Sequence, residues 1–349
     1  MASPAIRSRM FAFLLPLLLA TPSLAGDDAA HPTQRDPVDA VDVETTAALP
    51  PYPADALRAS EVDLDQLAKA VSAYRRGQLS EGDAIAASID ERMARTLLEW
   101  VAIRSAASVL PFSRIDAFLK ANPNYPATSL FRRRAEEMLV AERKSPAVVR
   151  AFFEGQKPVS PAGRIALALA LVAEGRSAEA LELARQSWRQ DHLGAPLEKI
   201  VLAAFGQDLT ATDHRLRTER YIFRGNDAAA LRNAARVSAD YVPLARARLA
   251  SGDARRPIAP SLIAAVPASL RGDVSFAFLQ AQQARRADKP QEAARWLAGV
   301  PRDPALLGDG DGWWIERRLV ARKLLDEGDA ATAYAVAAGH GAEDAAERI

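Results

Sequence analysis

The chain has 349 residues, of which 45 are basic, 44 are acidic and none is cysteine, and its formal net charge is +1. This balance argues against a nucleic-acid-binding domain, which usually carries a clear surplus of basic residues. The absence of cysteine excludes disulfides, thiolate metal sites and cysteine nucleophiles. Composition therefore predicts a soluble globular protein and does not indicate what that protein does.

The first 25 residues have the pattern of a secretory signal peptide. Arg7 and Arg9 precede an apolar run over residues 10–20, and Ser23 and Ala25 supply small side chains where a signal peptidase cleaves. The apolar run is shorter than the roughly 18 residues that a membrane-spanning helix needs. We therefore predict cleavage after Ala25, a periplasmic location and no membrane segment in the mature chain.

Residues 26–60 are rich in Pro and Asp and contain few branched apolar side chains. Such a stretch buries too little surface to offset its chain entropy, so we predict a disordered leader. From residue 61 onward Ala, Leu, Arg and Glu dominate, and these residues favour helices. We expect one α-helical domain over residues 61–349, incomplete at its C-terminal end.

Two helices are predicted on either side of Gly175. Gly175 is expected to end the first helix, and Ser177 is expected to cap the second. Apolar residues recur at helical spacing on one face of each helix: Leu167, Ala170 and Leu171 in the first, and Ala180, Leu183, Ala184 and Trp188 in the second. This pattern indicates a helical hairpin.

Similar hairpins recur along the chain. Residues 174–180 align with residues 327–333, and looser copies give turn positions at 175, 225, 252, 288 and 328. The intervals between these turn positions are irregular. A strict tetratricopeptide array has one helix pair per repeat and repeats about every 34 residues. One amphipathic hairpin cannot bury its apolar stripe alone, but stacked hairpins share a continuous core. We therefore predict an all-α fold, an irregular superhelix of stacked antiparallel helix pairs.

No catalytic or nucleotide-binding motif is recognised in the sequence, and we predict neither a cofactor nor a metal. Residues 308–312 alternate Gly and Asp like the start of a calcium loop, but Val320 stands where such a loop needs a Glu. This run predicts a flexible acidic turn. We expect a surface or capping role for each of the four histidines, His31, His192, His214 and His340.

Five residues are candidate contacts for a glycan or its peptide stems. Arg217, Arg220 and Arg224 fall at i, i+3 and i+7, hence on one helix face. They could bind carboxylates of an acidic polymer, or form a solvated face paired with neighbouring glutamates such as Glu219. Trp313 and Trp314 could stack on sugar rings or pack into the next hairpin.

A second basic cluster, Arg132 to Arg134, lies on a predicted helix that also carries Glu136 and Glu137. The arginines could bind the same kind of acidic polymer. The alternative is again a solvated helix face on which the arginines pair with these two glutamates.

Several short fragments follow one another in a characteristic order. They are Asn122-Pro123 with Tyr125-Pro126, Phe152-Phe153, Gly163-Arg164, Trp188-Arg189, Asp213-His214-Arg215, Trp313-Trp314-x-Glu316-Arg317 and His340-Gly341. Together with the export signal, this order resembles the superhelical domain of soluble lytic murein transglycosylases. The resemblance spans about residues 62–342.

This resemblance implies a U-shaped α-superhelix, an α-solenoid, in the periplasm. Members of the family add a lysozyme-like domain that cleaves the bond between N-acetylmuramic acid and N-acetylglucosamine and leaves a 1,6-anhydro end. That domain carries its catalytic Glu in a Glu-Ser motif followed by a Gly-Leu-Met-Gln segment, and neither motif occurs in this chain. We transfer no catalytic residue.

The resemblance predicts a non-catalytic superhelical part of a lytic transglycosylase, inactive alone, that holds or orients glycan strands. Its expected partners are peptidoglycan glycan strands or a separate catalytic module, without nucleic acid. The alternative is a periplasmic scaffold of tetratricopeptide type, which binds a partner protein.

Overall fold

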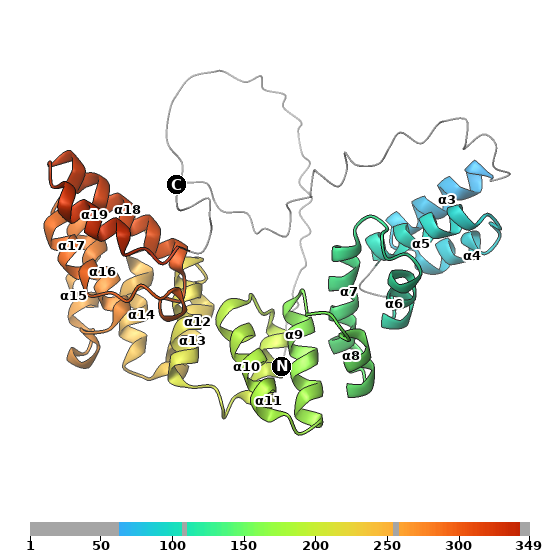
Figure 1. Ribbon diagram of the computed structural model, residues 1–349, viewed down its shortest axis with the longest axis horizontal. Coiled ribbons are helices and arrows are strands. Elements are labelled where there is room, and N and C mark those ends of the chain that lie inside the picture. The colour runs from blue at the N-terminus through green and yellow to red at the C-terminus, as the bar shows by residue number, and fades with distance from the viewer. Residues whose placement is uncertain (1–62, 107–109, 254–257, 343–349) are drawn as a thin grey trace, which may run out of the picture. The chain divides into compact units, whose positions relative to one another are not determined.

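The computed structural model describes residues 63–106, 110–253 and 258–342 (Figure 1). These residues contain 17 α-helices and no strand, which confirms the predicted all-α class. The predicted signal peptide, the predicted leader and the start of the predicted domain lie outside the described residues. All described residues belong to one of the two units of the chain, Pro53–Ile349.

Short connections join successive helices in the described part of the chain. The α-helices are α3 (Leu64–Arg75), α4 (Leu79–Ala86), α5 (Arg92–Ala106), α6 (Phe112–Ala121), α7 (Thr128–Ala141), α8 (Pro146–Phe152), α9 (Pro161–Ala173), α10 (Ser177–Gln190), α11 (Ala195–Phe205), α12 (Ala211–Phe223), α13 (Asp227–Val237), α14 (Tyr241–Ala250), α15 (Pro260–Ala264), α16 (Val274–Arg286), α17 (Pro290–Ala298), α18 (Gly310–Asp326) and α19 (Ala330–Ala338). Two 3-10 helices, Ala268–Leu270 and Pro304–Leu306, precede α16 and α18. Each helix packs mainly on helices that are near it in the sequence, as in a solenoid.

Five pairs of helices that pack against each other in the described part are joined by the same kind of turn: α3–α4, α9–α10, α12–α13, α16–α17 and α18–α19. The α7–α8 connection has the same backbone geometry at Arg143, but α8 packs mainly on α9. One residue of each of the five turns has left-handed backbone, namely Gly77, Gly175, Gly225, Asp288 and Gly328. The N–H of the next residue donates to a carbonyl of the preceding helix, as Arg176 N does to Leu171 O at 2.9 Å. This Schellman arrangement satisfies the last carbonyls and reverses the chain, so the two helices become neighbours.

The turns confirm most of the predicted repeat and correct two of its details. Residues 175, 225, 288 and 328 are turn residues as predicted, while Gly252 does not have the left-handed backbone. Ser177 does not cap α10, because the helix already begins at Ser177 and its N-cap residue is Arg176, whose side chain makes no capping bond. Gly77 marks a further turn of the same kind that the sequence comparison did not find.

A small buried residue lies five positions after each of the five turn residues. These residues are Gly82, Ala180, Ala230, Ala293 and Ala333. A small side chain at this position lets the second helix of a hairpin approach the first closely. At Gly82 even a methyl group is too large, because an added Cβ would lie 2.5 Å from Cδ1 of Tyr74.

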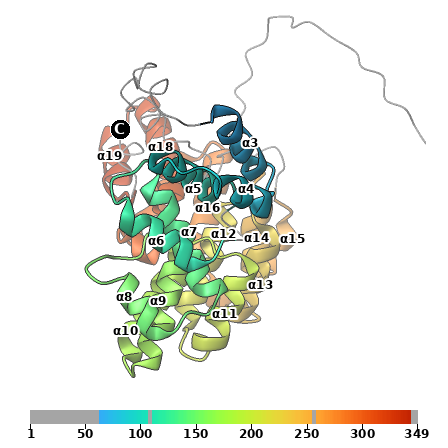
Figure 2. The same ribbon diagram turned by 90° about the vertical axis from the view of Figure 1, so that its right-hand side faces the viewer.

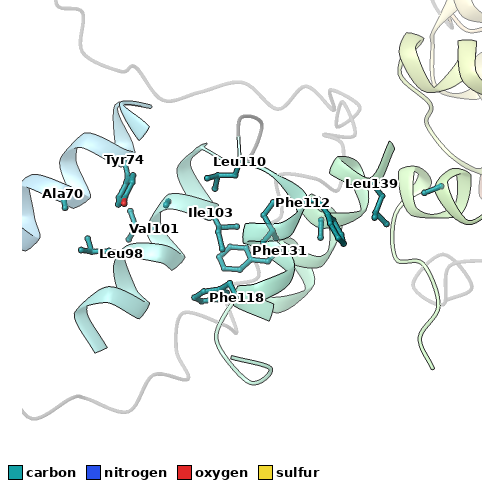
Figure 3. Packing of buried hydrophobic residues seen from close by; sticks show 14 of the residues in the cluster. Ala70, Tyr74, Leu98, Val101, Ile103, Leu110, Phe112, Phe118, Phe131 and Leu139 are labelled. Carbon is teal, nitrogen blue, oxygen red and sulfur yellow. The ribbon is translucent and has the colours of Figure 1, made fainter. Parts of the chain in front are cut away.

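The buried side chains form four adjoining clusters along the chain. Figure 3 shows the first, in which Tyr74 and Leu98 from α3 and α5 pack near Ile103, Phe118 and Phe131. The partly buried Leu167 packs against both this cluster and the one formed by α9 to α11.

The two clusters nearer the C-terminus are linked in the same way. The partly buried Trp296 packs against both the cluster of α12 to α16 and the cluster of α16 to α19. Figure 2 shows the neighbouring helices α12, α13 and α14. The core is therefore shared between hairpins, as expected for a solenoid-like stack.

Candidate functional site

Arg217 is buried inside the stack, with only 1% of its surface exposed. Its guanidinium lies over the ring of Trp188, 4.2 Å from the ring centroid, and donates from Nη1 to Trp188 O at 2.8 Å. Nη2 donates to the hydroxyl of Tyr221 at 2.5 Å and lies 3.6 Å from Glu198 Oε2. The predicted solvated face is therefore wrong for Arg217, which joins α10, α11 and α12 from within.

The other two arginines of this face are nearer the surface. Arg224 is exposed and Arg220 is partly buried. They line a narrow crevice together with Asp191, His192, Arg217 and Tyr221. Only Arg220 and Arg224 of the three predicted arginine contacts thus have side chains at the surface of the described structure.

Both predicted tryptophan contacts belong to the core. Trp313 is fully buried and packs edge-to-face on Phe278 of α16, with ring centroids 4.9 Å apart. Trp314 is 9% exposed and lies against His340, with centroids 5.5 Å apart. Neither indole presents an open face on which a sugar ring could stack.

The residues that follow this tryptophan pair connect three helices. Arg285 of α16 binds Glu316 of α18 through two hydrogen bonds, of 2.6 and 3.0 Å. Arg317 donates to Leu297 O at 3.1 Å and to Val336 O at 3.2 Å, and so ties α18 to α17 and α19. Burial, together with a smaller effect of the nearby Arg302, lowers the pKa of Arg317 to about 10.

The buried carboxylates of the described residues are committed to helix ends and ion pairs. Glu136 of α7 accepts bonds from the N–H of Ser160, at 2.7 Å, and from its hydroxyl, and so caps the start of α9. Glu219 accepts from the hydroxyls of Tyr241 and Ser275, at 3.0 and 2.6 Å, and faces Arg248. Each of these groups stabilises a joint between hairpins.

Asp213 plays a similar part at the start of α12. Its carboxylate accepts from Thr210 N and from the Thr210 hydroxyl, and it pairs with Arg189 at 2.6 Å. Burial alone raises the pKa of Asp213, but the bonds from Thr210 and Arg189 outweigh it and bring the pKa below its ordinary value. This carboxylate is therefore held ionised.

Asp273 has the opposite environment from Asp213. Burial raises the pKa of Asp273 above its ordinary value, and the nearby Glu219 adds to the increase. Its carboxylate caps α16 by accepting from Ser275 N at 2.8 Å. The carboxylate with the raised pKa, that of Asp273, is therefore already used as the N-cap of α16.

In the basic cluster of α7, Arg132 to Arg134, two of the arginines pair with neighbouring glutamates, as the second of the two predicted alternatives has it. Arg132 lies 3.5 Å from Glu136, and Arg134 lies 3.4 Å from Glu137. Arg133 is exposed. The cluster is a helix face with local ion pairs.

His214 is buried, with 7% of its surface exposed, and its ring packs edge-to-face against Trp188. The predicted surface or capping role is therefore wrong for His214. His192 is exposed, His340 accepts from Ala342 N at 3.4 Å, and His31 lies outside the described residues.

The Gly-Asp run at residues 308–312 begins a helix. Asp309 is the N-cap of α18 and accepts from Gly312 N at 2.9 Å. Gly312 lies against Phe223, where an added Cβ would stand 2.5 Å from the ring. The prediction of a flexible acidic turn is therefore wrong. Across the described residues, no group of three or more His, Asp or Glu side chains is arranged to hold a metal ion.

An open groove between α5 and α6 was not predicted from the sequence. It has a volume of about 480 Å³ and is lined by Asp90, Arg92, Arg95, Thr96, Glu99, Arg114, Ala117, Phe118, Ala121 and Asn122. The lining residues come from two helices and form no sequence motif. One sequence signal could have indicated these residues: several arginines and carboxylates precede the exposed alanines of α6, Ala117 and Ala121, in the sequence.

No described helix combines the length and the apolar composition needed to cross a bilayer. Comparisons of the chain with protein-family models, with characterised proteins and with solved structures give no match.

Proposed function

We propose that this chain is a non-catalytic helical support that holds or orients peptidoglycan glycan strands in the periplasm, as the superhelical part of a lytic transglycosylase. The observation that carries the proposal is the role of the fragments that resemble this family. Several of these fragments lie where neighbouring helices of the stack contact one another.

Three of the fragments illustrate this role. The carbonyl of Pro126, between α6 and α7, accepts a hydrogen bond of 2.8 Å from the indole N–H of Trp100. Trp188 supplies the ring and the carbonyl that hold Arg217. Arg317 reaches the carbonyl groups of two neighbouring helices. The resemblance thus rests on residues that have a physical function in a stacked-hairpin fold.

A supporting rather than a cutting role is also favoured by the carboxylates. A glycosidase acid must reach the scissile oxygen and remain protonated near neutral pH. Glu136, Asp213 and Glu219 are buried and bonded as caps or pairs, and Asp273 caps a helix. Moving any of these groups toward a substrate would break a joint of the stack.

The first experiment is co-sedimentation of the purified chain with peptidoglycan sacculi, with analysis of released sugars by mass spectrometry. We expect saturable retention and no release of 1,6-anhydromuropeptides. Retention should fall in Arg224→Ala, because Arg224 is an exposed candidate contact. Arg246→Ala is the matched control, since Arg246 is an exposed arginine of α14 that is not a candidate contact, and its retention should be unchanged.

Two outcomes would contradict this proposal. Release of 1,6-anhydromuropeptides by the chain alone would assign it catalysis. Absence of retention, combined with saturable binding to one periplasmic protein, would assign it the scaffold function of tetratricopeptide type.

A further inference from the structure

The groove between α5 and α6 has the size of a ligand site. Its volume of about 480 Å³ falls within the range of roughly 300 to 1,000 Å³ that is usual for small-ligand pockets. Ala117 and Ala121 are exposed on α6 and form, with the edge of Phe118, an apolar strip. Arg92, Arg95, Thr96 and Glu99 line the groove from α5.

Two charged side chains of the groove, Arg114 and Glu99, are held in place before any ligand binds. Arg114 donates to Glu99 from Nε at 2.7 Å and from Nη2 at 2.8 Å, and it also binds Asp83 at 2.8 and 3.0 Å. Side chains fixed in this way lose little freedom on binding, which favours affinity. Arg95 pairs with Asp90 at 2.9 Å at the surface, where the side chain of Asp90 is fully exposed.

The charges around the groove nearly cancel. The charged residues that line it are Arg92, Arg95, Arg114, Asp90 and Glu99. Asp83, which does not line the groove, forms an ion pair with Arg114. A strongly acidic or basic ligand would meet like charges on one wall. A neutral chain of hydroxyl groups would not, because each hydroxyl both donates and accepts a hydrogen bond.

The shape also favours a sugar chain over a peptide. Peptides are usually bound along a sheet edge, in an apolar groove that takes a helix, or in an aromatic groove that takes a polyproline helix. The α5–α6 groove offers polar walls and a narrow apolar strip of two alanines and one ring edge. A pyranose ring has the matching arrangement, with C–H groups on its faces and hydroxyls around its rim.

We propose that the α5–α6 groove binds an uncharged segment of a glycan chain, with the sugar faces on Ala117 and Ala121 and the hydroxyls on the polar walls. This assignment rests on the proposed function, since it names where the helical support contacts its strand. The groove is separate from the candidate contacts predicted from the sequence, which lie on α12, at its C-cap residue Arg224, and on α18.

The test is titration of the purified chain with chitotetraose, a neutral tetramer of N-acetylglucosamine, by isothermal calorimetry. Ala117→Leu and Ala121→Leu, made separately, fill the groove without adding charge. Each should weaken binding by tenfold or more. Ala178→Leu is the control, because Ala178 is an exposed alanine of α10 outside the groove, and its affinity should equal that of the unchanged chain.

Melting temperatures of all variants show whether any loss reflects folding. Equal affinity of the unchanged chain and of both groove variants, at equal melting temperatures, would overturn the proposal. So would binding of a free stem peptide that the leucine variants abolish while chitotetraose does not bind. Retention on sacculi without chitotetraose binding would contradict the groove assignment but leave the proposed supporting function intact. Absence of both sacculus retention and chitotetraose binding would contradict both proposals.

Discussion

Arg114 of α6 and Arg217 of α12 both hold neighbouring helices together, yet their surroundings differ. Arg114 is about one quarter exposed and binds two carboxylates, Asp83 and Glu99. Arg217 is buried, and its short bonds go to uncharged groups, the carbonyl of Trp188 and the hydroxyl of Tyr221. The only carboxylate that pairs with Arg217 in the described structure, Glu198, lies 3.6 Å away.

The two arginines therefore have pKa values shifted in opposite directions. The hydrogen bonds that Arg114 donates to Glu99 and to Asp83 raise the pKa of Arg114, because both carboxylates stabilise the cation. Burial lowers the pKa of Arg217, and the attraction of Glu198 does not compensate for the lost hydration. A charged joint near the surface is thus made by ion pairs, whereas the joint in the core depends on aromatic faces and carbonyl groups.

The largest expected effect is that of Arg217→Ala. This change removes the cation that Glu198 and the carbonyl groups of Trp188 and Asp191 face. It also leaves a cavity beside the rings of Trp188 and Tyr221. We expect a loss of about 3 to 5 kcal/mol in the free energy of unfolding, as for one partner of a buried pair. Arg114→Ala is the matched change, and we expect a loss of about 1 kcal/mol because its partners remain hydrated. Urea denaturation measures both.

A third variant separates charge from packing at position 217. Methionine fills similar space without a charge, but it leaves Glu198 and the carbonyl of Trp188 without this partner, just as alanine does. Arg217→Met should therefore recover only the part of the stability that Arg217→Ala loses through its cavity, and the remaining loss measures the missing charge and hydrogen bonds. If Arg217→Ala and Arg114→Ala were equally destabilising, the contrast between the two joints would be unfounded.

An intermediate effect on the free energy of unfolding is expected at the turns of the α3–α4 and α12–α13 hairpins. The residue five positions after the turn is Gly82 in α4 and Ala230 in α13. Gly82→Ala should destabilise by about 1 to 3 kcal/mol, because the new methyl group meets the Tyr74 ring. Ala230→Gly should cost about 1 to 2 kcal/mol, through lost helix propensity and the loss of one buried methyl group.

Thermal unfolding can compare these two variants with Tyr74→Leu/Gly82→Ala. The double variant gives the methyl group room, so it should lose less stability than the sum of Tyr74→Leu and Gly82→Ala measured singly. Strict additivity would show that the ring and the glycine do not share one contact.

Much of the fold could be predicted because a hairpin leaves local signals in the sequence. Gly175 ends α9, and the apolar spacing of Ala180, Ala184 and Trp188 identifies the buried face of α10. The turn at Gly77 was missed although Gly82 follows it at the same interval as Ala180 follows Gly175. A search for a glycine followed five residues later by a small residue would have found it.

The candidate site could not be predicted in the same way, because it depends on which helix covers which face. Spacing places Arg217, Arg220 and Arg224 on one face of α12, but it does not show that Trp188 of α10 covers the first of them. The α5–α6 groove arises from the packing of two helices on a shared core. Its residues have no common period or motif.

The smallest expected effect is a pH dependence beside the buried arginine. Burial lowers the pKa of His214 below its ordinary value, and the nearby Arg236 and Arg217 oppose its protonation further. The unfolded chain therefore binds a proton more readily than the folded chain. The stability contributed by neutral His214 is complete above about pH 6.5 and is lost as the pH falls from there toward the folded pKa.

His214→Phe keeps a ring beside Trp188 and should remove this part of the decline in melting temperature between pH 7 and pH 5. His192→Phe is the control, because His192 is exposed, and it should keep the decline of the unchanged chain. The environment of Arg114 should respond only at lower pH, since hydrogen bonds from Arg114 hold the pKa of its partner Asp83 below its ordinary value. An unaltered decline in His214→Phe would mean that the cationic surroundings of the buried joint do not act on His214.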